Sequence, residues 1–80
     1  MAEPSQRRLQ RAIDALSAVE DPLERLTRVR LARQRMEELE LEQIRSLREA
    51  GTPWRTIGAQ YGLTKQGAQQ RFKSALKDDA

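Results

Sequence analysis

The placement of glycine and proline divides this chain into two regions. All four glycines fall between Gly51 and Gly67, and Pro53, one of three prolines, lies among them. Glycine and proline mark the positions where helices stop and start. The C-terminal third is therefore expected to hold short helices separated by tight turns, and longer helices are expected before it.

The segment from Ser5 to Glu20 is predicted to be an amphipathic helix. Its apolar residues recur at spacings of three and four, as the positions of one helical face do. They are Leu9, Ala12, Ile13, Leu16 and Val19.

A second helix is predicted to begin at Pro22. Asp21 is suited to cap it, Pro22 to occupy its first position, and Glu24 stands where a capping box places its acid. The apolar pattern continues as far as Gly51, but its stripe changes register near residues 37–42. The pattern therefore leaves open whether one continuous helix covers residues 22–50 or whether it bends or breaks there.

No segment alternates apolar and polar residues as a strand does, so the fold class is predicted to be all-α. A chain of 80 residues forms only a marginal core, and two amphipathic helices without a third partner cannot close one. Their apolar faces are expected to meet those of a second copy in a homodimer, although the stripe fits higher oligomers equally well. The predicted dimerisation residues are Leu9, Ile13, Leu16, Val19, Leu23, Leu26 and Val29.

The predicted organisation has three parts. Residues 1–43 form a helical dimerisation arm, residues 44–77 a tri-helical domain that can share the long helix 22–50, and residues 78–80 a tail. Cysteine and histidine are absent, which removes disulfides, thiol nucleophiles, imidazole bases and the usual zinc ligand sets. No enzymatic activity, cofactor or metal is expected.

The membrane is not an expected partner. No apolar run approaches the roughly 18 residues that span a bilayer, and the N-terminus has no segment like a signal peptide. The chain is expected to be soluble and cytoplasmic, in association with the nucleoid.

The net charge of +3 is unevenly distributed. Residues 1–50 contain ten arginines and ten acids, which cancel. Residues 51–77 contain no acid, and their basic residues are Arg55, Lys65, Arg71, Lys73 and Lys77. A local excess of positive charge is typical of a surface that binds a polyanion.

The glycine-containing third is predicted to hold two helices joined by a turn. Gly51 is expected to end the long helix, and Thr52 and Pro53 to cap and start a short one. Its apolar face comprises Trp54, Ile57 and Tyr61, and Gly58 leaves room for close packing.

Gly62 is expected to end the short helix, and Thr64 to cap the last one, which runs from Lys65 toward Leu76. One side of that helix is apolar, with Ala68, Phe72, Ala75 and Leu76. The other side is polar, with Lys65, Gln66, Gln69, Gln70 and Lys73. Glutamine can bind an adenine edge, and lysine can reach guanine acceptors or a phosphate. The pattern predicts a helix-turn-helix that presents its second helix to the major groove.

The segment IGAQYGLTKQGAQQRFKSAL resembles the helix-turn-helix of the C-terminal DNA-binding region of bacterial sigma factors and of small regulators with sigma-like domains. The matching positions are Ile57-Gly58, Gly62-Leu63-Thr64, Ala68 and Arg71-Phe72. The resemblance covers about residues 44–77, and it implies that Thr64 to Arg71 carry phosphate and base contacts. Gly67 inside the helix and the bulky Phe72 depart from the pattern, and residues 1–43 resemble no sigma region.

The sequence therefore predicts a small homodimeric bacterial transcriptional regulator that binds double-stranded DNA sequence-specifically. The predicted base contacts are Lys65, Gln66, Gln69 and Gln70. The predicted phosphate contacts are Arg55, Thr64, Arg71 and Lys73. The alternative is a protein-interaction module whose sigma-like domain docks on RNA polymerase or another regulator. The operator, and whether binding activates or represses, do not follow from the sequence.

Overall fold

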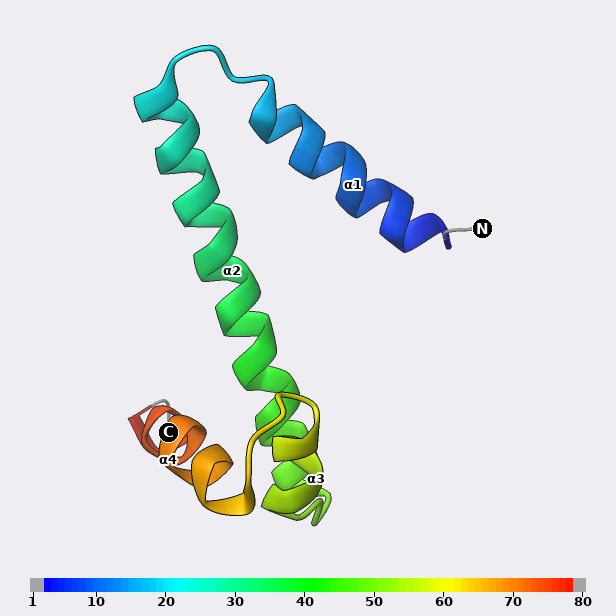
Figure 1. Cartoon of the computed structure of the whole chain (residues 1–80), viewed down its shortest axis with the longest axis vertical. Helices are drawn as coiled ribbons and strands as arrows, with labels where there is room; N and C mark the ends of the chain where they lie inside the picture. Colours follow the sequence, from blue (N-terminus) through cyan, green and yellow to red (C-terminus); the bar gives the residue numbers. More distant parts are fainter. Residues whose placement is uncertain (1–2, 79–80) are drawn as a thin grey trace. The chain divides into compact units, whose positions relative to one another are not determined.

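Every regular element in the described residues, 3–78, is a helix in the computed structural model (Figure 1). The helices are α1 (Pro4–Ser17), α2 (Pro22–Glu49), α3 (Trp54–Ala59) and α4 (Lys65–Asp78). The all-α prediction is thus confirmed over this range. Of the predicted tail, Asp78 is the last residue of α4, and residues 79–80 lie outside the described residues.

The chain divides into two compact units, and the boundary lies between Arg35 and Met36. The first part of the long helix α2 belongs to the first unit and the rest to the second. This helix is continuous to Glu49, without a break at residues 37–42. The apolar stripe of α2 changes register near residues 37–42 because the helix passes from one unit to the other close to these residues. The apolar residues before Met36 belong to one unit and none of those described is buried, whereas Leu41 and Ile44 pack in the core of the other.

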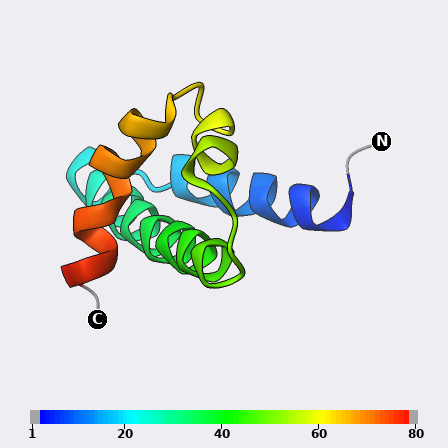
Figure 2. The same ribbon diagram turned by 90° about the horizontal axis from the view of Figure 1, so that it is seen from below.

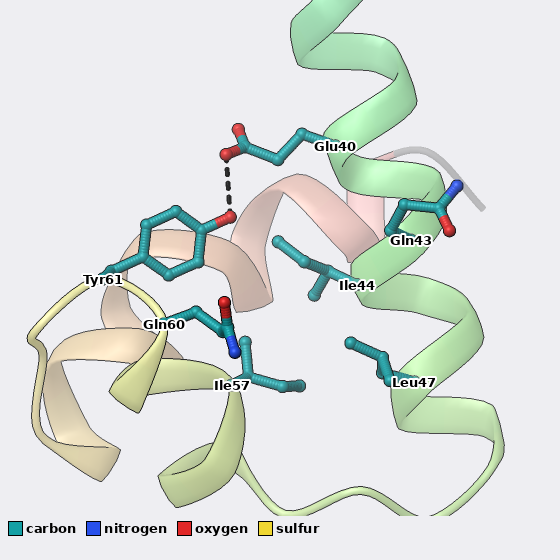
Figure 3. A pocket seen from close by; sticks show the side chains of 7 residues that line it. All are labelled: Glu40, Gln43, Ile44, Leu47, Ile57, Gln60 and Tyr61. Atoms are coloured by element: carbon teal, nitrogen blue, oxygen red, sulfur yellow. Dashed lines mark hydrogen bonds between the residues drawn. The ribbon is translucent and has the colours of Figure 1, made fainter. Parts of the chain in front are cut away.

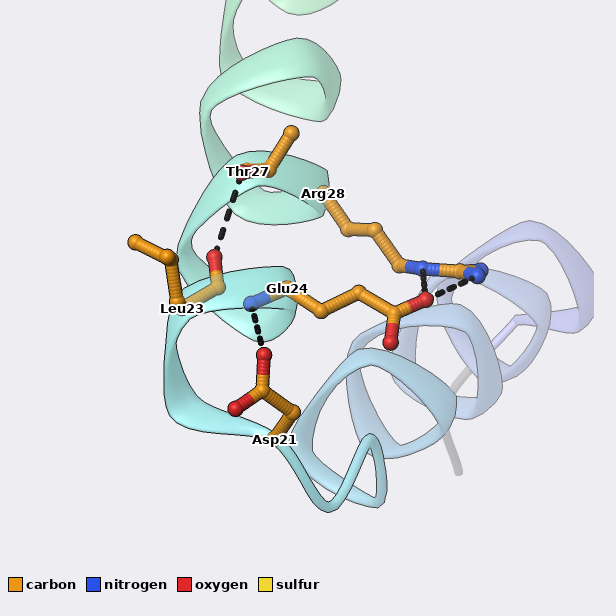
Figure 4. Close-up of polar contacts among 5 residues, drawn as sticks. All are labelled: Asp21, Leu23, Glu24, Thr27 and Arg28. Carbon is orange, nitrogen blue, oxygen red and sulfur yellow. Dashed lines mark hydrogen bonds and ion pairs between the residues drawn. The ribbon is translucent and has the colours of Figure 1, made fainter.

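Asp21 caps α2 and Pro22 begins it as the sequence predicts, whereas the Glu24 carboxylate, expected to complete a capping box, pairs with Arg28 (Figure 4). The backbone N–H of Glu24 donates a hydrogen bond to Oδ2 of Asp21 at 2.9 Å, and Pro22 is the first helical residue. The Glu24 carboxylate forms an ion pair with Arg28 on the next turn, at 2.7 Å. Both side chains of this pair are about half exposed, so it adds less than about 1 kcal/mol to stability.

Two glycines end helices α2 and α3 by the same hydrogen-bond pattern. Gly51 and Gly62 have φ values of 88° and 67°, the left-handed region that favours glycine. After α2, the N–H of Thr52 donates to the carbonyl of Leu47 at 2.9 Å, and the N–H of Gly51 donates to that of Arg48 at 3.0 Å. This pair of bonds is a Schellman motif.

The second motif follows α3, where Leu63 donates to Gly58 at 2.8 Å and Gly62 donates to Ala59 at 3.3 Å. The prediction for the start of α3 is wrong. Pro53 itself is the N-cap residue and no side chain caps the helix, because Thr52 is already part of the turn that closes α2.

The core of the second unit consists of side chains from α2, α3 and α4. Its buried members are Ile44, Trp54, Ile57, Ala68 and Phe72. Leu41, Tyr61 and Leu76 are partly buried against them. Figure 2 shows α3 and α4 joined by a short turn and set at an angle to each other. Trp54, predicted to be a packing residue, is 6% exposed.

In the first unit, α1 and the first half of α2 have no buried residue. Of the predicted dimerisation residues, Leu16 and Val19 are half-buried. The others are exposed: Leu9 (48%), Ile13 (46%), Leu23 (72%), Leu26 (54%) and Val29 (44%). The apolar stripe that the sequence predicts is therefore largely uncovered in a single chain.

Candidate nucleic-acid interface

The turn between α3 and α4 is held tightly against Gly58. A Cβ atom at this position would lie 2.8 Å from the Leu63 carbonyl oxygen, 3.0 Å from that of Thr64 and 3.3 Å from Cβ of Ala68. The two helices can approach this closely only because Gly58 lacks a side chain. The close packing predicted at Gly58 is thus confirmed, and it involves both the turn and α4.

Thr64 caps α4 as the sequence predicts. Its Oγ1 atom accepts a hydrogen bond from the backbone N–H of Gly67 at 3.1 Å. The Thr64 residue is exposed, so its hydroxyl hydrogen can still be donated to an outside group. A Cβ at Gly67 would lie 3.3 Å from Thr64 Oγ1 and 3.5 Å from Leu63 Cβ. The nearest atoms to Gly67 thus belong to the cap and the turn, and not to α3.

The two sides of α4 differ in burial. Ala68 and Phe72 are buried, and Ala75 and Leu76 are half-buried. Three of the four predicted base-contacting residues, Lys65, Gln66 and Gln70, are exposed. Gln69 is half-buried, so it lies at the border between the two sides.

Gln66 and Gln70 are four positions apart and thus lie one helical turn apart on the same side of α4. The exposed Lys73 lies close to this side as well. The geometry therefore favours Gln66 and Gln70 over Gln69 as residues that could reach a base edge.

The predicted phosphate-contacting residues all lie at the surface. Arg55 is exposed in the first turn of α3, and Thr64, Arg71 and Lys73 are exposed at the start and middle of α4. Because residues 51–77 contain no acid, no carboxylate in this segment opposes their positive charge.

Tyr61 has a role beyond the packing that the sequence predicts. Its hydroxyl donates a 2.7 Å hydrogen bond to Oε2 of Glu40 on α2 (Figure 3). Its ring lies 5.0 Å from the ring of Phe72, and the Arg71 guanidinium carbon lies 5.0 Å from its centroid. No local sequence signal indicates these contacts, because Glu40 and Tyr61 are 21 residues apart.

The Tyr61 side chain also lines a groove of about 420 Å³ between α2 and α3. Figure 3 shows the Tyr61 ring pointing across this groove toward Glu40. The other residues that line it are Glu40, Gln43, Ile44, Leu47, Ile57 and Gln60. Tyr61 therefore connects the long helix with the turn and with α4.

The pKa of the Tyr61 phenol is raised above 10.0, first by burial and then by the hydrogen bond and negative charge of Glu40, while Arg71 opposes the shift. A raised folded-state pKa means that the folded protein holds this proton more tightly than the unfolded chain. The stabilisation is complete below about pH 10 and is lost as the pH rises through the folded-state pKa.

We expect the free energy of unfolding to fall above about pH 10 more steeply for the wild type than for Tyr61→Phe. Urea unfolding across this pH range measures the difference. Tyr61 is the only tyrosine, so tyrosinate absorbance reports its titration directly. A folded-state midpoint at or below the value of free tyrosine would contradict the expectation.

Comparison of the chain with protein-family models, curated proteins and solved structures gave no match. Among the described residues, no helix is long and apolar enough to cross a membrane. Within the same range, no three His, Cys, Asp or Glu side chains gather where they could hold a metal ion.

Proposed function

We propose that the protein binds double-stranded DNA sequence-specifically, with α4 in the major groove, as a small homodimeric transcriptional regulator. The observation that carries this proposal is the solvent-facing side of α4. Gln66, Gln70 and Lys73 are exposed there, while Ala68 and Phe72 anchor the opposite side in the core. A helix held in this way can enter a groove without exposing apolar side chains.

The chemistry of the exposed side chains supports a nucleic-acid partner. Glutamine can make two hydrogen bonds to adenine, and lysine can bind guanine acceptors or phosphate. Arg55, Thr64, Arg71 and Lys73 add exposed groups that donate hydrogen bonds, and three of them are cationic. Phosphate contacts of this kind set the register of the helix, and base contacts give specificity.

The uncovered apolar stripe of the first unit supports the homodimer. Leu23 and Leu26 are more than half exposed, and Leu9, Ile13 and Val29 are nearly so. Exposed apolar side chains that recur at helical spacing favour association. One helix-turn-helix makes few contacts, so a monomer would bind weakly and with strong salt dependence. A two-fold dimer would place two copies of α4 on half-sites about 10 base pairs apart, or a multiple of that spacing.

The test is selection of bound duplexes from random DNA at about 150 mM salt, followed by sequencing. We expect an enriched inverted repeat, which reports specificity and two-fold symmetry together. A single enriched half-site would keep DNA binding and reject the symmetric dimer. If no sequence is enriched and binding vanishes as the salt concentration rises, the basic surface binds DNA only by nonspecific electrostatic attraction. The alternative, docking of this domain on RNA polymerase or another regulator, would then be favoured.

The variants Gln66→Ala and Gln70→Ala test in the same experiment whether α4 is the helix that contacts the bases. Each is expected to weaken binding to the selected site by about 5- to 150-fold, which corresponds to about 1–3 kcal/mol per lost base contact. Gln34→Ala is the matched control, because Gln34 is also an exposed helical glutamine but lies in α2. Unchanged affinity and preference in both α4 variants would reject the assignment of α4.

A further inference from the structure

We infer that Tyr61 is a positioning residue for DNA binding: it holds the Arg71 guanidinium in place for a phosphate contact. This inference rests on the proposed function. It adds a residue of the turn to the interface, although that residue itself touches no DNA in the proposed arrangement.

The contacts of Arg71 are the first part of the argument. Its guanidinium carbon lies 5.0 Å from the centroid of the Tyr61 ring and 5.2 Å from that of the Phe72 ring. Both distances are within the range of a cation–π interaction. Arg71 is nevertheless exposed, so its N–H groups can reach an outside acceptor while the aromatic rings support the guanidinium. Arginine can both stack on aromatic faces and bind phosphate through its planar fork.

The contacts of Tyr61 are the second part. The hydroxyl is fixed by the 2.7 Å hydrogen bond to Glu40, and the ring packs against Phe72 at 5.0 Å with an interplanar angle of 49°. The ring is thus held at its hydroxyl by α2 and along its body by α4. Because Glu40 and Phe72 hold the Tyr61 ring, the ring restricts the movement of the Arg71 guanidinium that lies on it.

The benefit of this restriction is entropic. Arginine has a long side chain, and immobilising such a side chain at an interface costs affinity. A guanidinium already held near its bound position loses less freedom when DNA arrives. Lys73 is the useful contrast, because it is an exposed cation two positions further along α4 and is also a predicted phosphate contact. The cation that lies over the Tyr61 ring is Arg71 and not Lys73.

A double-mutant cycle on the selected duplex tests the inference. Tyr61→Leu removes the aromatic ring and is expected to weaken binding by about two- to tenfold. Arg71→Ala is expected to weaken binding and to lower the salt slope by about one unit. In the Arg71→Ala background, Tyr61→Leu should have no further effect, because Tyr61 acts through Arg71. Tyr61→Phe keeps the ring but loses the bond to Glu40, so its loss of affinity should be smaller than that of Tyr61→Leu.

The control cycle pairs Tyr61→Leu with Lys73→Ala, and here the two effects should add. Additive effects with Arg71 as well would overturn the inference, because Tyr61 would then support the domain in general. All affinities are measured at a temperature where circular dichroism shows every variant to be folded.

A measurement without DNA separates this inference from the proposed function. The heteronuclear NOE of the Arg71 side-chain Nε–H group should fall in Tyr61→Leu, and should fall less in Tyr61→Phe, which keeps the ring. An unchanged NOE in Tyr61→Leu would overturn the positioning role even if DNA binds. If the NOE falls but neither Arg71→Ala nor Gln66→Ala alters DNA binding, the proposed function fails, and the role of Tyr61 in DNA binding fails with it.

Discussion

Replacing Phe72 with alanine is expected to unfold most of the second unit at room temperature. The Phe72 side chain is 4% exposed and packs in the cluster formed by Ile44, Trp54, Ile57 and Ala68. Removing a buried phenylalanine side chain costs about 3–5 kcal/mol, because apolar burial is lost and a cavity remains. A core in a chain this short supplies little more than that in total.

Urea unfolding followed by circular dichroism measures the effect. Phe72→Leu retains much of the apolar volume and should lose clearly less stability than Phe72→Ala. Leu31→Ala is the control for a large-to-small change at a surface position, since Leu31 is 58% exposed on α2. It should change the free energy of unfolding by no more than about 0.5 kcal/mol. Equal losses in Phe72→Ala and Leu31→Ala would contradict the assigned core.

Replacing Gly58 with alanine is expected to destabilise the second unit by about 1–3 kcal/mol. Helix propensity alone predicts the opposite sign, because alanine is better than glycine inside a helix by about 1 kcal/mol. The new Cβ would lie 2.8 and 3.0 Å from the carbonyl oxygens of Leu63 and Thr64. Both are backbone atoms, so the whole turn before α4 would have to move.

The same substitution at Gly67 is the matched control, because Gly67 is also a helical glycine. Its nearest neighbour is the Thr64 hydroxyl at 3.3 Å, a side-chain atom that can shift slightly. We expect Gly67→Ala to change stability by less than about 1 kcal/mol, since the gain in propensity offsets the tight contact. Thermal unfolding of both variants measures the contrast. A stabilised Gly58→Ala protein would show that the turn does not press against α3.

Local signals in the sequence were sufficient for most helix boundaries. Asp21 before Pro22 begins α2, Gly51 ends it, and Thr64 caps α4, because each of these positions acts through atoms only a few residues away. Two boundaries differ from the prediction: α1 ends at Ser17 and not at Glu20, and Thr52 does not cap α3. The N–H of Thr52 bonds to the carbonyl of Leu47 and closes the turn after α2. Thr52 is thereby held in that turn and does not take the capping position of α3.

The candidate site was predictable in part. Helical periodicity separates Ala68 and Phe72 from Gln66 and Gln70, and the structure places the first pair in the core and leaves the second pair exposed. Periodicity could not resolve Gln69, because a residue at the border of two sides is covered or exposed according to what packs beside it. Its role as a base contact remains a prediction, as does the dimer of the first unit.

The sequence by itself determined the order of the helices, the turns at the glycines and the position of the acid-free basic segment. Helix caps, turns and local charge depend on residues that are near neighbours in the chain. The bond from Tyr61 to Glu40 and the close approach of Gly58 to the turn before α4 appear only in the folded chain. The contact between the Arg71 guanidinium and the Tyr61 ring also appears only in the folded chain. Each of these contacts requires segments to be brought together by a shared core, and a local pattern carries no information about which distant side chain will arrive.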